Sequence, residues 1–201
     1  MNLRATLAAC AVVAVGVTVL AAVTDGYRAA TAEEAWRLAV AERPRPLPDA
    51  TLLDQSGRAF RLSALRGRRV LVEFFYTSCP AICGLLASSF QAIRDALVER
   101  PHGREVVLLS ISFDPARDTA AEIAEYATRL GTDGRRIWRV VHVEDPEELR
   151  GLLHAFGVVV LPDDGGGFVH NAAVYLVDAD GRLARIYHPA AAERAFAEVA
   201  E

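Results

Sequence analysis

The 201-residue sequence contains no lysine, so all 22 of its basic residues are arginines. A Schiff-base lysine and a lysine-bearing P-loop are therefore excluded. The only methionine is Met1, which excludes a methionine ligand to a metal within the folded domain. The 26 acidic residues give a net charge of −4, which argues against a nucleic-acid binder because such a protein carries a basic surface. Cysteine is also scarce, but two of the three cysteines, Cys79 and Cys83, lie four positions apart.

The composition favours one folded domain behind an N-terminal segment. Hydrophobic residues make up 52% of the chain and charged residues 24%, which is enough for a buried core. We expect an anchor or signal segment over residues 1–24, a tether over 25–50 and the folded domain over 51–201. Within the tether, Thr31–Ala41 predicts a helix that begins with a threonine cap. The proline-rich stretch Arg43–Pro48 cannot continue that helix.

The N-terminal segment contains an uncharged run, Ala5–Val23, with Arg4 before it. About 20 helical residues span about 30 Å, the thickness of a bilayer core. We therefore expect an N-terminal membrane helix that anchors the chain in a bacterial-type inner membrane, with the soluble domain on the periplasmic side. A signal peptide cleaved after Ala32 is the main alternative, and a lipidated Cys10 is a third. Each alternative places the cysteine pair in an oxidising compartment.

From residue 51 onward, strand and helix patterns alternate. Val70–Tyr76 and Glu105–Phe113 are nearly continuous β-forming runs, typical of central strands covered on both faces. The other expected elements are a hairpin around Gln55–Gly57, helices over Leu86–Leu97, Ile123–Leu130 and Leu149–Phe156, a strand at Ile137–Val143, a hairpin joining Ala172–Val177 to Leu183–Tyr187, and a helix over Ala190–Ala200. Strand-helix-strand units imply parallel pairing and the last hairpin implies antiparallel pairing. We predict an α/β domain with a thioredoxin-like mixed sheet flanked by helices and extended by an N-terminal β-hairpin.

The segment Tyr76–Cys83 joins the first central strand to a helix. Pro80 suits the first helical position, so we expect Cys79 at the cap and Cys83 one turn further along the same face. Their β-carbons would lie about 5–6 Å apart, which lets both sulfurs hold one ion or form a disulfide. The helix N-terminus favours thiolates, which are both nucleophiles and metal ligands. A structural disulfide is the alternative, but its very short loop would constrain little. The spacing leaves redox chemistry and metal binding both open.

Among the five histidines, His170 lies where a metal ligand is expected. It follows the glycine-rich loop Pro162–Gly167 and precedes the strand Ala172–Val177, and in a thioredoxin-like topology this loop approaches the cysteines. Cys79, Cys83 and His170 would supply two sulfurs and one imidazole, a set that suits Cu(I), with zinc as the competitor. The alternative is a solvated loop histidine. The other histidines are expected to be ordinary surface or core residues: His102, His142, His154 and His188.

Three motifs in this order resemble the Sco/SenC family. They are Tyr76–Cys83, Ile111–Thr119, and Val169-His170 ahead of Val174–Leu176. The resemblance covers Pro48 to the C-terminus and implies a membrane-tethered thioredoxin-fold protein that delivers copper during cytochrome c oxidase assembly. It also carries the family's copper ligands onto Cys79, Cys83 and His170. The sequence departs from the family pattern at Gly84, where many members have proline, and at Asn171 with Gly165–Gly167, where the surroundings are usually more acidic.

Three carboxylates accompany these motifs. Asp114 either orients a metal ligand by bonding to that ligand's side chain, without contacting the metal, or forms a turn. Asp118 or Thr119 either contributes to the site or caps the next helix. Glu73 lies six residues before Cys79, near the offset at which thioredoxins place a buried carboxylate that exchanges protons with the cysteine pair. Burial would raise the pKa of Glu73, whereas the alternative is a glutamate on an open sheet face paired with an arginine.

The resemblance implies first a copper metallochaperone that passes one ion to the binuclear copper site of cytochrome c oxidase. Its partners would be the copper-site subunit and, through the N-terminal helix, the membrane. The alternative is a thiol-disulfide oxidoreductase that reduces the cysteines of that copper site, with Cys79 and Cys83 as a redox-active pair that forms a disulfide when oxidised. We favour a metal carrier over an enzyme. A third hypothesis, a peroxidase, makes no use of His170, so His170 discriminates between these functions.

Overall fold

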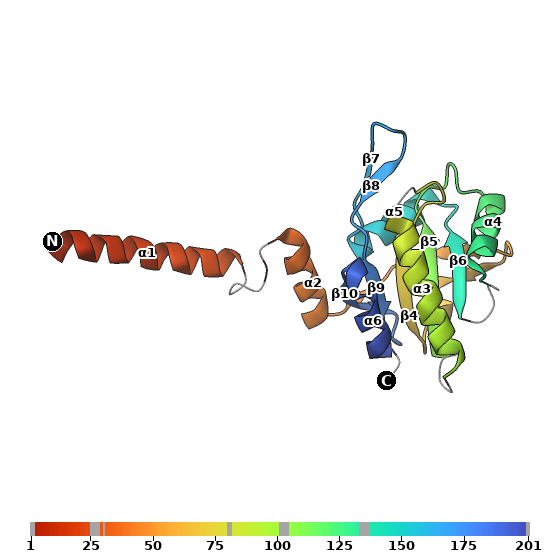
Figure 1. The fold of residues 1–201 in the computed structure, drawn as a ribbon, viewed down its shortest axis with the longest axis horizontal. Helices are drawn as coiled ribbons and strands as arrows, with labels where there is room; N and C mark the ends of the chain where they lie inside the picture. The colour runs from red at the N-terminus through yellow and green to blue at the C-terminus, as the bar shows by residue number, and fades with distance from the viewer. Residues whose placement is uncertain are drawn as a thin grey trace. The chain divides into compact units, whose positions relative to one another are not determined.

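The computed structural model describes residues 3–24, 29, 31–79, 82–100, 105–132 and 137–199. The chain divides into two compact units, Met1–Glu42 and Arg43–Glu201. The first unit contains helices α1 (Leu3–Val23) and α2 (Ala32–Glu42) (Figure 1). Thr31 caps α2 as predicted, because its hydroxyl accepts a hydrogen bond from the Glu34 N–H and the Glu34 carboxylate accepts one from the Thr31 N–H.

Among the described residues, no helix has both the length and the apolar character needed to cross a membrane. The membrane helix expected at Ala5–Val23 therefore has no support from the structure, although this run is helical as part of α1. Alanine is frequent in the run, and its small side chain contributes little apolar surface.

Within the described part of the second unit, eight strands form one mixed sheet in the order β1-β10-β9-β4-β5-β6-β2-β3. The strands are β1 (Arg45–Pro46), β2 (Thr51–Asp54), β3 (Ala59–Arg61), β4 (Arg69–Phe75), β5 (Val106–Ser112), β6 (Trp138–His142), β9 (Val174–Val177) and β10 (Arg182–Tyr187). The pairs β4–β5 and β5–β6 are parallel, and the other pairs are antiparallel. The predicted mixed α/β sheet is thus confirmed, and the early hairpin β2–β3 lies at one edge.

Helices pack on both faces of this sheet (Figure 1). They are α3 (Ile82–Val98), α4 (Ala120–Leu130), α5 (Pro146–Phe156) and α6 (Ala192–Val199), with short 3-10 turns η1 (Leu62–Leu65) and η3 (Pro189–Ala191). Phe75 stacks on Tyr126 of α4 with ring centroids 4.6 Å apart, whereas the preceding Phe74 meets Phe156 of α5 at 5.1 Å. Successive strand residues point to opposite faces, so α4 and α5 cover opposite sides of β4.

The helix ends follow the sequence signals. The Asp145 carboxylate accepts hydrogen bonds from the first turn of α5, with Pro146 at the first helical position. Gly131 and Gly157 end α4 and α5 in the left-handed conformation, which costs glycine little. The last helix begins two residues later than expected because Pro189–Ala191 forms a 3-10 turn first.

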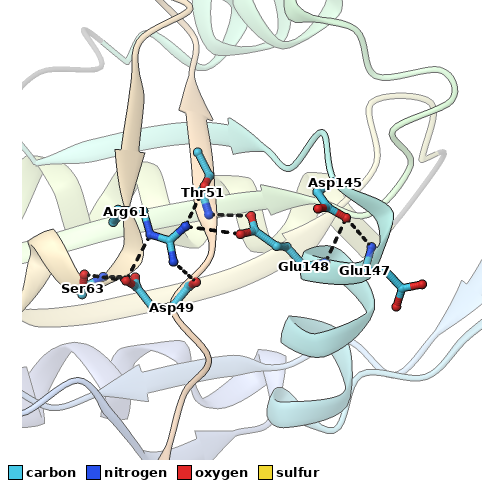
Figure 2. A network of polar contacts seen from close by, with 7 residues as sticks. All are labelled: Asp49, Thr51, Arg61, Ser63, Asp145, Glu147 and Glu148. Carbon is cyan, nitrogen blue, oxygen red and sulfur yellow. Dashed lines mark hydrogen bonds and ion pairs between the residues drawn. The ribbon is translucent and has the colours of Figure 1, made fainter.

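A polar network fastens the β2–β3 hairpin to α5 (Figure 2). The Arg61 guanidinium donates to Asp49, to the Thr51 hydroxyl at 2.9 Å and to Glu148 at 3.3 Å. The second carboxylate oxygen of Glu148 accepts from the Thr51 N–H at 2.8 Å. Asp49 in turn accepts from the backbone N–H and hydroxyl of Ser63. The network holds the segment before β2 against the edge of the domain.

A separate two-stranded ribbon carries His170 and was not predicted. Strands β7 (Val160–Pro162) and β8 (Phe168–His170) pair with each other, and within the described residues neither joins the main sheet. The ribbon projects beyond the sheet in Figure 1. The expected loop Pro162–Gly167 is its tip, and His170 ends its second strand rather than lying in a loop.

Candidate metal centre

The segment Tyr76–Cys83, called here the cysteine loop, begins where β4 ends. The Cys79 N–H donates to the Tyr76 carbonyl at 3.1 Å, which closes a turn. Cys79 is half-buried and is a free thiol, so the disulfide expected for the oxidised form is not present. Cys83 lies in the first turn of α3, but its side chain lies outside the described residues, as does the predicted helix start at Pro80.

His170 is half-buried, and its imidazole packs edge-on against Phe113 with ring centroids 5.0 Å apart. Both ring nitrogens are buried, and neither has a hydrogen-bond partner among the described residues. Burial lowers the pKa of His170, so the imidazole is neutral at neutral pH and keeps a lone pair for a metal. An unpaired buried polar group costs about 1–3 kcal/mol, which a metal bond would offset. A solvated loop histidine is not what the structure shows.

Aromatic side chains connect the cysteine loop to the ribbon. The Tyr76 ring meets the Phe168 ring edge-on with centroids 5.3 Å apart, and both contact Phe113. The Tyr76 hydroxyl also accepts from the Phe168 N–H at 3.3 Å and reaches the Phe168 carbonyl at 3.4 Å. Tyr76 is three residues before Cys79 and Phe168 is two before His170, so the segments that carry these two candidate ligands meet.

The ribbon tip requires glycine. The Asp163 carboxylate accepts from the backbone N–H groups of Gly165 and Gly167, each at 2.8 Å. Gly166 has a φ of 78°, a conformation that strains other residues. A β-carbon on Gly167 would lie 2.9 Å from the Asp163 carboxylate and 3.1 Å from the Tyr76 hydroxyl, so a side chain there would displace one or both of these groups.

Asp114 and Asp118 lie in the turn that follows β5. Asp114 is buried and pairs with Arg117, and the Arg117 side chain also donates to the Gly166 carbonyl at the ribbon tip. Asp118 is buried and accepts hydrogen bonds from Thr77 in the cysteine loop. The predicted cap of the next helix is confirmed at Thr119, which caps α4, and is wrong for Asp118.

Glu73 is 2% exposed in the centre of β4. The Ser110 hydroxyl donates to its carboxylate at 2.6 Å, and the Trp138 indole N–H donates to the Ser110 hydroxyl at 2.9 Å. Burial raises the pKa of Glu73 to about 8. The alternative of an exposed glutamate paired with an arginine is therefore wrong, and its role as a proton-exchange group stays a prediction.

Comparison with known proteins settles the family. The SCO1/SenC family model matches residues 41–201. The chain belongs to the SCO1/SenC family. A protein from Stutzerimonas stutzeri, provisionally described as copper-binding, is 30% identical over 147 residues, which cover 70% of this chain and 68% of that protein. The copper-bound structure of Bradyrhizobium japonicum ScoI is 26% identical with a TM-score of 0.63, covering 77% of this chain and 99% of that one.

A third comparison supports the fold alone. BsSco, described as having a disulfide switch and as a member of the Sco family of cytochrome c oxidase assembly proteins, is 21% identical with a TM-score of 0.66. The similarity covers 78% of this chain and 92% of that one. The mixed sheet flanked by helices is therefore the thioredoxin-like architecture of Sco structures.

In this Sco-family chain, His142 also has one buried ring nitrogen without a partner among the described residues, whereas both ring nitrogens of His170 are in that state. His142 is buried in β6, His154 is exposed on α5, and His188 accepts a hydrogen bond from the Ala190 N–H, while His102 lies outside the described residues. Among the side chains that the structure describes, no three His, Cys, Asp or Glu residues form a metal-binding group.

Sequence reasoning missed two residues that hold the ribbon. Arg117 is one, and Asn171 is the other: it accepts from the Val159 N–H at 2.7 Å and donates to the Gly157 carbonyl at 2.9 Å. An asparagine directly after a candidate ligand is a signal that could have indicated this role.

Proposed function

We propose that this protein is a copper carrier that binds one copper ion through Cys79, Cys83 and His170. Membership of the SCO1/SenC family supports the proposal, as do the copper-bound and copper-binding relatives. The observation that carries it is the neutral His170 imidazole, whose two ring nitrogens are buried and have no hydrogen-bond partner among the described residues, on a ribbon that contacts the cysteine loop. A dithiol reductase would not need such a histidine.

The donor set explains the choice of metal. Two thiolates are soft ligands that favour Cu(I), and one imidazole completes a three-coordinate site. Metal binding requires deprotonated thiols and a neutral imidazole, and burial of His170 already favours the neutral form. Behind the ligands, Asp114 would act as an orienting carboxylate and Glu73 as a proton-exchange group.

The acceptor that fits best is the binuclear copper site of cytochrome c oxidase, and the partner is its copper-site subunit. Support comes from membership of the SCO1/SenC family, because the resemblance to that family implies a role in cytochrome c oxidase assembly. A second candidate is a thiol-disulfide oxidoreductase that reduces the cysteines of that copper site. The half-buried free thiol of Cys79 favours it.

Oxidase activity in cells at limiting copper separates the two candidates. For a copper carrier, His170→Ala should abolish oxidase assembly as completely as Cys79→Ser, because two thiolates alone leave the ion one ligand short. The exposed His154 provides the control, and His154→Ala should leave assembly intact. Normal oxidase activity with His170→Ala and none with Cys79→Ser would reject the carrier and favour the reductase.

The location is proposed from the sequence alone. We expect residues 1–24 to attach the chain to a bacterial-type inner membrane, with the metal site on the periplasmic side, because Ala5–Val23 carries no charge. Fractionation and N-terminal sequencing test this. A protein recovered away from membranes that begins at Glu33 would reject the anchor in favour of a cleaved signal.

A further inference from the structure

Two neighbouring residues, Arg117 and Asp118, bond to the two different segments that carry the candidate metal ligands. They lie in the turn after β5, at the same sheet edge as the cysteine loop, because β4 and β5 are parallel. The turn is closed by backbone hydrogen bonds to the Asp114 carbonyl, from the Arg117 N–H at 3.1 Å and from the Asp118 N–H at 2.8 Å. The two side chains therefore start from one fixed piece of backbone.

Asp118 holds the cysteine loop. Its side chain is almost fully buried, and its carboxylate accepts from the Thr77 backbone N–H at 3.0 Å and from the Thr77 hydroxyl at 2.5 Å. It also accepts from the Ser112 hydroxyl at 2.5 Å, which links it to the end of β5. Thr77 is two residues before Cys79, so these bonds fix the backbone from which the first thiolate projects.

Arg117 holds the histidine ribbon. One guanidinium nitrogen donates to the Gly166 carbonyl at 2.6 Å, and the group lies 4.9 Å from the centre of the Phe168 ring. The buried carboxylate of Asp114 fixes the guanidinium from the other side. Because β7 and β8 pair with each other and not with the main sheet in the described chain, the position of His170 depends on such side-chain contacts.

We propose that Arg117 and Asp118 are positioning residues that together set the separation between the cysteine loop and His170. The inference rests on the proposed function, since the separation matters for a site that uses both cysteine and histidine ligands. Arg117 controls whether the imidazole reaches the ion, and Asp118 controls the thiolates. Substitutions at Arg117 and Asp118 should therefore have separable effects, which we call the Arg117 arm (the imidazole) and the Asp118 arm (the thiolates).

A double-mutant cycle on copper affinity tests the Arg117 arm in the full-length reduced protein. Arg117→Gln should weaken Cu(I) binding about tenfold, the lower end of the cost of losing a residue that supports a ligand. In a His170→Ala background the same substitution should cost nothing further, because the ligand that it positions is absent. Equal losses in both backgrounds, or no loss in either, would overturn the inference.

Arg129 offers a matched control. It is a half-exposed arginine that pairs with the Glu125 carboxylate and lies 5.4 Å from the centre of the Tyr126 ring. Like Arg117, it therefore contacts one carboxylate and one aromatic ring, but both of these partners lie on α4. Arg129→Gln should leave copper affinity unchanged in both backgrounds. A loss equal to that of Arg117→Gln would show that removing any such arginine weakens the site, and would overturn the inference.

Amide hydrogen exchange of the metal-free protein separates this inference from the proposed function. Arg117→Gln should accelerate exchange at residues 168–170 several-fold and leave β4 unchanged. Unchanged exchange would overturn the positioning role while the loss of affinity in His170→Ala, and with it the proposed function, stands. Full copper affinity in His170→Ala would reject the ligand set itself, and the inference would fall with it even if exchange is accelerated.

The reduction potential of the cysteine pair tests the Asp118 arm. Asp118→Asn replaces one acceptor oxygen by an amide that cannot accept from Thr77, so the potential should shift measurably. Arg117→Gln should leave the potential unchanged. An unchanged potential in Asp118→Asn, or equal shifts in both variants, would overturn the separation of the two arms.

Discussion

Glu73 shows how one residue combines local chemistry with stability. It is fully enclosed in the sheet, and its carboxyl group contacts the Ser110 hydroxyl, which also accepts from Trp138. Trp138 packs against Phe90 of α3 with ring centroids 5.9 Å apart, so this polar chain lies beneath the helix that carries Cys83. A charge there would be poorly solvated, and burial accordingly raises the pKa of Glu73 to about 8.

Stability should therefore fall as pH rises. The folded state holds a proton on Glu73 up to about pH 8, whereas the unfolded chain releases it near pH 4.5, so the folded state binds more protons between these values. Over that window the free energy of unfolding should drop by an amount on the order of 3–5 kcal/mol through this one group. Glu73→Gln should remove this dependence and be more stable than the wild type at pH 9, as measured by urea unfolding at pH 5, 7 and 9.

The control for this experiment is Glu125→Gln, which removes an exposed carboxylate from α4. Its pH dependence should match that of the wild type. If Glu73→Gln and the wild type keep a constant stability difference from pH 5 to pH 9, Glu73 is already ionised at neutral pH and the proton-exchange role loses its basis.

At the level of elements, the domain depends on side chains that fasten peripheral segments to the sheet. Glu148 on α5 accepts from the Thr51 N–H and from Arg61, and its side chain is 28% exposed (Figure 2). The next residue toward the N-terminus, Glu147, is 79% exposed and pairs with Arg150 on the same helix. The two glutamates lie on the same helix, but Glu148 contacts the β2–β3 hairpin and Glu147 contacts its own helix.

Glu148→Gln should lower the free energy of unfolding by about 1–2 kcal/mol, because a charged acceptor of a part-buried backbone N–H is lost. Glu147→Gln should change it by less than about 0.5 kcal/mol, as is usual for exposed ion pairs. Thermal or urea unfolding of both variants measures the difference. Equal effects would show that the network adds nothing beyond surface charge.

The elements of the main sheet could be predicted, and the ribbon could not. Continuous apolar runs produce β4 and β5, and Gly131 and Asp145 mark helix ends by local chemistry. The ribbon strands β7 and β8 are three residues each and none of their residues is fully buried, so their short apolar stretches do not indicate a strand that packs on a core. Strand β1 is a two-residue pairing with β10 and leaves no pattern either.

The candidate site divides in the same way. Cys79, Cys83 and His170 could be chosen by residue type and spacing. The contacts of Asp118 with Thr77 and of Arg117 with Gly166 join positions 41 and 49 residues apart, so no local pattern reveals them. Burial of Glu73 likewise depends on how α3 covers the sheet, which only the tertiary structure determines.

At the scale of the whole molecule, the sheet supports the segments that carry the candidate metal site. The parallel strands β4 and β5 end at one edge, where the cysteine loop and the Asp114–Thr119 turn follow them, and the ribbon is fastened to both. This arrangement brings the cysteine loop and the ribbon that ends in His170, the segments that carry the proposed ligands, to a common edge from positions far apart in the sequence. If Cys79, Cys83 and His170 hold the ion as proposed, oxidation of the cysteines would remove two of the three ligands and would link copper binding to redox state.

Copper titration of the purified full-length protein, fully reduced and fully oxidised, tests the central claim most directly. The reduced protein should bind about one copper per chain, with sulfur and nitrogen ligands seen by X-ray absorption, and the oxidised protein should bind none tightly, because metal binding needs free thiolates. Equal affinity in both redox states, or a copper spectrum without sulfur ligands, would contradict the proposal that Cys79, Cys83 and His170 carry the ion.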